Sequence, residues 1–300
     1  MTQSSERVHR FVTNDFTIRA ACVNATEAVA TMQQIQGTLP IATVAVGRAM
    51  VGAILMSSNM KEGSIGLLFK GNGALLSVYA EAAQNGDVRG YTPMGHYSPP
   101  DYKEGLSIKD HIGNGFLTVS RILPHQKTPH QGTVKMVSGE IGEDIAHYLH
   151  QSQQIRSVIS VGVYVDTYGK VLSAGGVLIE VMPGVEQDVV TKLEENVKSN
   201  TTLVSKMILE GKSALELVEP FLKGFDYTEL DHDFPVRYSC PCTKERVLDA
   251  MMLFGIPELD DIIQKNEQTA VTCQMCGKPY ELSVEDIKTV RDKMHKSSLH

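Results

Sequence analysis

The sequence predicts an α+β fold, with an N-terminal domain of largely antiparallel sheets around a buried helix, a helical linker and a small C-terminal module. Three observations predict it. Three Asn-Gly pairs lie beside runs of β-branched and aromatic residues, which is a strong hairpin signal. A long apolar run begins at Pro40, and four of the five cysteines lie between residues 240 and 276. We therefore expect three parts, 1–183, 184–231 and 232–300.

The N-terminal part contains short runs rich in β-branched, aromatic and other apolar residues, which favour strands. Several of these runs are separated by short turns, so we expect antiparallel pairing rather than a doubly wound parallel sheet. The candidate strands are residues 16–23, 65–70, 75–81, 116–121, 133–137, 157–165 and 170–180.

Two helices are expected after the first strand. Thr26 is a suitable N-cap for a helix that ends near Gln36, and Pro40 suits the first turn of the next helix. The second helix is apolar on nearly all sides, so we expect sheet to cover it on several sides. Its apolar run, residues 40–56, is shorter than the ~20 residues that span a bilayer, and we expect no contact with a membrane.

The predicted linker, residues 184–231, is charged and helical, with 15 charged side chains in 48 positions. Its apolar residues recur at helical spacing, and Ser213 with Glu216 forms a capping-box pattern. The helices are short and rich in β-branched residues, and isolated helices under ~12 to 15 residues are marginal in water. These helices must therefore pack against another part of the protein to stay folded.

The C-terminal part, residues 232–300, is predicted to hold short helices and one hairpin. Thr243 caps the first helix, Gly255 ends it and Pro257 begins the second. A hairpin is expected within residues 273–282, and Ser283 begins the last helix. This part has little apolar content, so its core is thin and a bound metal would add the missing stability.

The cysteines of this part form two pairs, Cys240-Pro241-Cys242 and Cys273-Gln274-Met275-Cys276, separated by 30 residues. Four thiolates match the ligand set of a tetrahedral zinc ion, and Gly277 suits the turn that follows the second pair. The sequence therefore predicts one zinc ion held by Cys240, Cys242, Cys273 and Cys276. The fifth cysteine, Cys22, is expected to be a small core residue.

Zinc-bound thiolates are also the form that oxidants attack, and each cysteine has a near neighbour with which to form a disulfide. Oxidation would then expel the metal and unfold the module, and with it the marginal helices. Arg237, Lys244 and Arg246 flank the first pair and could stabilise its thiolates. From the residues alone, a purely structural zinc site remains the alternative.

Charge and composition bear on other classes of protein. The net charge of −7 argues against a dedicated nucleic-acid binder. A zinc-ribbon adaptor would need a basic face, whereas residues 232–300 hold 9 lysines and arginines against 11 acids. A thiol oxidoreductase would place the C-x-x-C pair at the start of a helix in a βαβ pattern, which this part lacks. The N-terminus shows no secretory signal pattern, so we expect a cytoplasmic protein.

The cysteine pattern also resembles a known family. The segment Pro235-Val236-Arg237-Tyr238-Ser239-Cys240-Pro241-Cys242-Thr243-Lys244-Glu245-Arg246, with Cys273-Gln274-Met275-Cys276, is similar to the redox switch of the bacterial thirty-three-kilodalton heat-shock protein family. The resemblance extends upstream to Val137-Ser138-Gly139-Glu140-Ile141-Gly142-Glu143-Asp144 and to residues 157–184, and covers essentially the whole chain.

The resemblance implies an ATP-independent holdase chaperone rather than an enzyme, and so no catalytic residue. It implies that the reduced, zinc-bound form is inactive. It also implies that oxidation forms the disulfides Cys240–Cys242 and Cys273–Cys276, releases zinc and unfolds the linker. The implied partners are unfolded client proteins, a second copy of the chain on activation and ATP-dependent foldases downstream. A structural zinc-ribbon adaptor and a thiol oxidoreductase are the alternatives.

Overall fold

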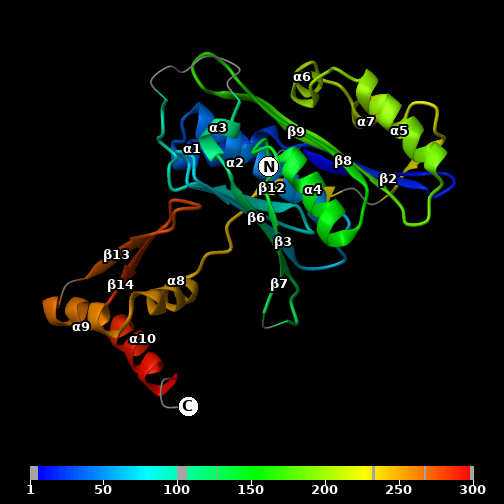
Figure 1. Ribbon diagram of the computed structural model, residues 1–300. Coiled ribbons are helices and arrows are strands. Elements are labelled where there is room, and N and C mark those ends of the chain that lie inside the picture. Colours follow the sequence, from blue (N-terminus) through cyan, green and yellow to red (C-terminus); the bar gives the residue numbers. More distant parts are fainter. Residues whose placement is uncertain (1–5, 100–106, 127, 232–233, 267, 298–300) are drawn as a thin grey trace. The chain divides into compact units, whose positions relative to one another are not determined.

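The computed structural model describes residues 6–99, 107–126, 128–231, 234–266 and 268–297. The chain forms two compact units, residues 1–239 and 240–300, and each is described by itself (Figure 1). The first unit contains two six-stranded sheets and the second a two-stranded hairpin. The predicted α+β class with largely antiparallel sheets is confirmed. The predicted third part begins at residue 232, and residues 232 and 233 lie outside the described ranges.

The first sheet has the strand order β10-β1-β2-β9-β8, and β11 also pairs with β1. All of these pairs are antiparallel. Strand β1 was not among the predicted strands, because its apolar residues are mixed with charged ones and bury in two different cores, Val8 in one and Phe11 in the other. The strands are β1 (Arg7–Thr13), β2 (Ile18–Asn24), β8 (Ser157–Val165), β9 (Val171–Val181), β10 (Tyr227–Glu229) and β11 (Phe234–Pro235).

The second sheet has the order β12-β5-β4-β3-β6-β7. Strand β12 pairs with β5 in parallel, and the other neighbours are antiparallel. Strand β5 was missed by the sequence analysis, since it is short and one of its two buried positions is Gly90. The strands are β3 (Ser64–Gly71), β4 (Ser77–Ala83), β5 (Asp87–Tyr91), β6 (Gly115–Ile122), β7 (His130–Lys135) and β12 (Arg237–Tyr238).

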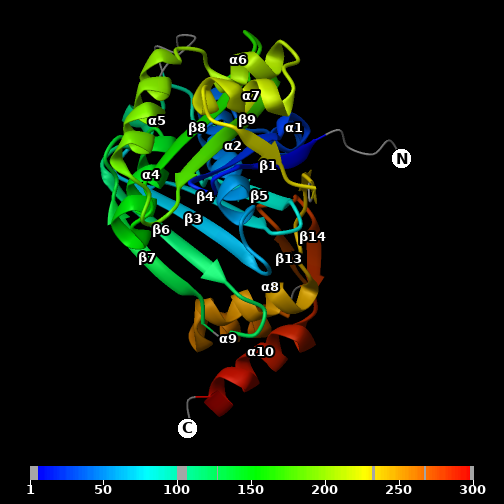
Figure 2. The ribbon, with the colours of Figure 1, turned by 90° about the vertical axis from the view of Figure 1, so that its right-hand side faces the viewer.

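Helix α2 (Pro40–Ser57) lies between the two sheets, as predicted for an apolar helix (Figure 2). By length and composition α2 could cross a membrane, but most of it is buried inside this unit. Around the same core lie α1 (Thr26–Gln36), α3 (Lys109–Ile112) and α4 (Gly142–Gln153).

The predicted N-cap of α1, Thr26, is wrong by one residue, because the N-cap is Ala25 and makes no side-chain cap bond. Instead, the carboxylate of Glu6 accepts hydrogen bonds from the N–H groups of Glu27, at 2.5 Å, and Ala28, at 3.2 Å. A residue 21 positions upstream of Glu27 therefore takes over the capping role.

Helices α5 (Gln187–Ser199), α6 (Val204–Leu209) and α7 (Ala214–Leu222) follow β9. They pack on the face of the first sheet that is turned away from α2 (Figures 1 and 2). The predicted capping box of Ser213 and Glu216 is present at the start of α7, and the helix continues through Pro220. The predicted linker helices therefore belong to the first compact unit.

The second unit holds α8 (Lys244–Met251), a 3-10 turn (Met252–Phe254), α9 (Ile256–Lys265), β13 (Thr269–Thr272), β14 (Pro279–Leu282) and α10 (Val284–Ser297). Thr243 caps α8 by accepting a hydrogen bond from the N–H of Arg246, as predicted. Among the described residues of this unit, few apolar side chains are buried: Met251, Leu259, Tyr280, Leu282, Ile287 and Val290. The core is as thin as its composition predicts.

Candidate metal centre

Cys273 and Cys276 lie in the turn between β13 and β14. The N–H of Cys273 donates to Lys278 O at 2.9 Å, and the N–H of Gly277 donates to Cys273 O at 2.8 Å. Gly277 has φ 70°, a left-handed conformation that glycine adopts at little cost. The hairpin thus forms a closed knuckle that presents both sulfur atoms on one side.

Cys240 and Cys242 lie between β12 and α8. The guanidinium of Arg246 donates to Pro241 O at 3.0 Å, which holds the single intervening residue. Cys242 is followed directly by Thr243, the cap of α8. The start of this helix therefore sets where the second sulfur of the pair lies.

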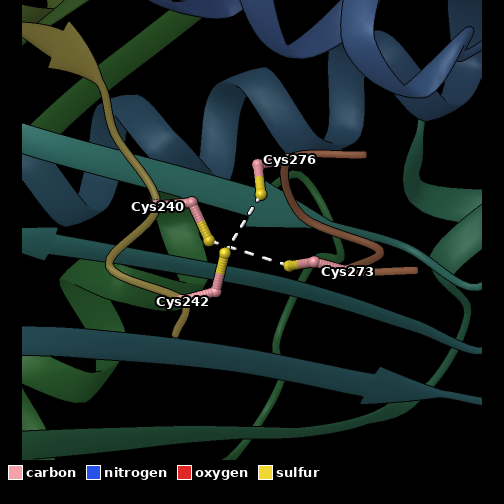
Figure 3. A group of neighbouring side chains, drawn as sticks. All are labelled: Cys240, Cys242, Cys273 and Cys276. Atoms are coloured by element: carbon pink, nitrogen blue, oxygen red, sulfur yellow. Dashed lines mark hydrogen bonds between the residues drawn. The ribbon is translucent and has the colours of Figure 1, made fainter. Parts of the chain in front are cut away.

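The four sulfur atoms lie within 4.8 Å of one another (Figure 3). The sulfur of Cys240 is 3.8 Å from that of Cys273, and the sulfur of Cys242 is 3.2 Å from that of Cys276. Sulfur atoms 2.3 Å from a zinc ion at the corners of a tetrahedron would be about 3.8 Å apart. All four cysteines are thiols rather than disulfides, so the residues fit a zinc ion.

The four thiols have unequal environments. At Cys242, burial disfavours the thiolate, but hydrogen bonds from Tyr280 and from the neighbouring thiols outweigh it and lower the pKa. At Cys276, burial raises the pKa, and the hydrogen bond from the backbone of Lys278 opposes the rise only in part. Binding of a cation would favour the thiolate form of all four residues.

The cations that flank the first pair all have other partners. Arg237 forms an ion pair with Asp87, and Lys244 forms one with Asp286 at 2.7 Å. Arg246 donates to the carbonyl of Pro241. These contacts hold the three cations around the first pair, and their effect on its thiolates stays a prediction.

Asp286 and Tyr280 support the centre and were missed by the sequence analysis. The Asp286 carboxylate accepts bonds from the Ser283 hydroxyl at 2.8 Å and from Lys244, joining the start of α8 to the start of α10. These bonds, with that of Lys244 the strongest, lower the pKa of Asp286 to about 2. The hydroxyl of Tyr280 lies 3.1 Å from the sulfur of Cys242. Alternation along β14 was the available signal, since it turns Tyr280 and Leu282 to the same buried side.

Two other residues named from the sequence, Cys22 and Asp144, are buried in the first unit. Cys22 is fully buried on β2, as predicted. Asp144, in the first turn of α4, is also fully buried, and it accepts hydrogen bonds from the N–H groups of Val137, Ser138 and Gly139 at 2.7 to 2.9 Å. It therefore fixes the loop before α4.

Comparison with known proteins gives consistent results. A family model described as Hsp33 protein matches residues 6–283. The 33 kDa chaperonin of Synechococcus elongatus is 37% identical over 276 residues, covering 90% of this chain and 92% of that protein. The 33 kDa chaperonin of Thermodesulfovibrio yellowstonii is 36% identical over 284 residues, covering 94% and 97%.

A solved structure also matches. The crystal structure of the 33 kDa chaperonin, or heat shock protein 33 homolog, of Thermotoga maritima superposes with a TM-score of 0.83 at 28% identity. The match covers 97% of this chain and 99% of that chain. Fold, cysteine centre and full-length similarity agree, and the chain belongs to the Hsp33 protein family.

Proposed function

We propose that this protein is a redox-regulated, ATP-independent holdase chaperone and not an enzyme. Its relatives are named chaperonins, which supports the chaperone role. The observation that carries the redox part is that one chain combines a cluster of four thiols with an apolar sheet face covered by short helices. In this proposal the zinc-bound, reduced form is inactive because that face is covered.

The covered face is the half of the first sheet that points away from α2. Successive side chains on a strand point to opposite faces, so β2 and β9 each contribute to two separate cores. The sheet side chains under the helices are Phe11, Ile18, Ala20, Cys22, Val177, Ile179 and Val181. The helix side chains that cover them are Val190, Leu193, Val204, Met207, Ile208, Leu217, Val218, Phe221 and Leu222.

The covering helices depend on this contact. Helix α5 has 13 residues, α6 has 6 and α7 has 9 with Pro220 inside it. Helices of this length are marginal in water without tertiary packing. Residues 184–231 therefore form the proposed metastable linker between the proposed 1–183 core and 232–300 switch domain, and its release would expose an apolar surface to which unfolding proteins bind.

We propose that oxidation forms the disulfides Cys240–Cys242 and Cys273–Cys276. The two bonds take four electrons from four thiolates and reduce two peroxide molecules to four hydroxide ions. No thiolate then remains to hold zinc. The thin core of the second unit supports the idea that this unit unfolds when the metal leaves.

The proposed partners are unfolded client proteins, a second copy of this chain on activation and ATP-dependent foldases that receive the clients. We also propose a cytoplasmic location, with no nucleic-acid or membrane partner. The net charge of −7 supports the absence of a nucleic-acid partner.

The test uses the full chain, reduced and loaded with zinc. One half is treated with peroxide at elevated temperature, and we measure zinc release, disulfide connectivity by peptide mapping, and light scattering of a heat-denaturing client enzyme. We expect strong suppression of scattering only after zinc release, reversed by a reductant. The variant Leu215→Ala, at an exposed position of α7, is the control and should behave like the wild type. Suppression that does not depend on redox state, or zinc that stays bound, would contradict the proposal.

A further inference from the structure

Tyr280 places a hydroxyl group beside one of the four sulfur atoms. Its side chain is 7% exposed, and its hydroxyl lies 3.1 Å from the sulfur and 2.9 Å from the carbonyl oxygen of Cys242. Both distances are within hydrogen-bonding range. One phenol therefore contacts both the ligand atom and the backbone of the same cysteine.

This contact crosses between the two halves of the centre. Tyr280 belongs to β14, directly after the knuckle of Cys273 and Cys276, and pairs with Val271 of β13. Cys242 belongs to the other pair, 38 positions earlier in the chain. The hydroxyl thus ties the C-x-C segment to the hairpin that carries the C-x-x-C segment.

The aromatic ring is held in place on more than one side. It packs in the small core of the second unit, and the ammonium group of Lys278 lies 5.1 Å from its centroid. A buried ring held in this way delivers its hydroxyl at low entropic cost. The hydrogen bonding of the Tyr280 hydroxyl to Cys242 is thus part of the resting structure of the second unit.

A hydrogen bond to a thiolate withdraws electron density from sulfur and fixes the direction of its lone pairs. Groups of this kind around a metal ligand orient it and alter its reactivity, and their loss costs about 10-fold to 100-fold in metal affinity in other sites. A less electron-rich sulfur also attacks peroxide more slowly.

We propose that Tyr280 is a positioning residue of the centre, which holds Cys242 in its ligating geometry and slows oxidation of its sulfur. The proposal rests on the proposed function. In it, Tyr280 sets how readily an oxidant releases zinc from the centre. In this proposal the hydroxyl group, rather than the aromatic ring, acts on the sulfur of Cys242.

The test compares Tyr280→Phe with the wild type in the full-length reduced protein. Phenylalanine keeps the ring and removes only the hydroxyl. The matched control is Thr289→Val, which removes an exposed hydroxyl of α10 whose hydrogen bond goes to Glu285 O. We measure zinc affinity by chelator competition, the charge-transfer spectrum of the cobalt(II)-substituted centre, and the rate of zinc release by peroxide.

For Tyr280→Phe we expect zinc binding about 10-fold to 100-fold weaker, a shifted sulfur-to-cobalt band and faster zinc release, with Thr289→Val unchanged. An unchanged cobalt spectrum and affinity in Tyr280→Phe would overturn the assignment. Because these readouts do not involve chaperone activity, that result would leave the holdase proposal intact. A wild type that binds zinc but never couples its loss to client binding would overturn the holdase proposal instead.

Discussion

Cys22 is a buried thiol beneath the linker helices. Its side chain is fully buried on β2, and its sulfur lies 3.6 Å from Ala214 O, in the first residue of α7. Burial raises the pKa of this thiol to about 12, so at neutral pH it is protonated and unreactive. If α7 left the sheet, as proposed, water would reach the thiol and its pKa would fall toward ~8.5.

We predict that oxidation increases the rate of Cys22 alkylation at pH 8 by at least about 100-fold, because the thiolate fraction rises with exposure. The rate is measured by mass spectrometry of the peptide that contains Cys22 after timed treatment with iodoacetamide. The reduced, zinc-bound protein is the reference. Zinc loss without any change in this rate would show that the linker stays on the sheet.

Glu6 is a buried carboxyl group. Burial raises its pKa to about 7, while hydrogen bonds from the backbone N–H groups of Glu27 and Ala28 lower it and only partly offset that effect. The unfolded value is 4.5, so the folded chain binds more protons than the unfolded chain between about pH 4.5 and pH 7. The stability contributed by protonated Glu6 is therefore present at low pH and is lost as the pH rises through about 7.

We predict that Glu6→Gln flattens this pH dependence. Between pH 5 and pH 8 the wild type should lose up to about 3 kcal/mol more stability than the variant, since each pKa unit corresponds to about 1.4 kcal/mol. Denaturant unfolding of the reduced, zinc-bound proteins at several pH values measures the difference. Parallel pH profiles for the two proteins would show that Glu6 does not titrate in this range.

At the scale of elements, α7 offers two leucines with opposite environments. Leu217 is 3% exposed and packs on the sheet, whereas Leu215 is 50% exposed. Removal of a buried leucine side chain costs about 2 to 5 kcal/mol, while a change at an exposed position is usually within about 0.5 kcal/mol. The loss of the Leu217 side chain would therefore weaken the packing of α7 on the first sheet.

We predict that Leu217→Ala suppresses client aggregation without any oxidant, while Leu215→Ala behaves like the wild type. Light scattering under reducing conditions with excess zinc measures the activity, and circular dichroism confirms that the rest of the chain is folded. Equal activity of the two variants, or no activity in Leu217→Ala, would count against linker-gated binding.

At the scale of the whole molecule, the chain between the linker and the cysteine centre is tied to both sheets of the first unit. Strands β10 and β11 pair with β1, and β12 pairs with β5. Val236 is 1% exposed, and its N–H donates to Glu6 O at 2.9 Å. The N–H of Ser239 donates to Val88 O at 3.0 Å, immediately before Cys240.

The amide bonds of Val236, Arg237 and Ser239 lie beside the main core of the first unit, which contains Val236, so we predict that they outlast zinc removal. In hydrogen exchange after chelation of zinc, amides of α8 to α10 should lose protection, because that unit has a thin core. The amides of Val236, Arg237 and Ser239 should keep theirs. Loss of protection at these three amides together with α8 to α10 would place them inside the switch.

Much of the fold could be predicted from short-range patterns. The residues of α2 are apolar on nearly all sides, and the capping box at Ser213 and the cap at Thr243 involve groups within three residues of each other. The strand at 157–165 agrees with β8. The two cysteine pairs predicted the candidate ligand set because four thiolates are a typical ligand set for zinc. The short spacing within each pair already places two of the four sulfur atoms near each other.

The sequence by itself therefore determined the α+β class, the main helices and the four candidate zinc ligands. Only the tertiary structure decided that Glu6 caps α1, that Tyr280 reaches Cys242 and that α5 to α7 cover an apolar face which includes Cys22. The physical reason is how far apart along the chain the interacting groups lie. Caps, turns and helix periodicity act within a few residues, whereas these contacts join groups about 20 to 190 positions apart, and burial and hydrogen bonding at such separations exist only once the sheets have formed.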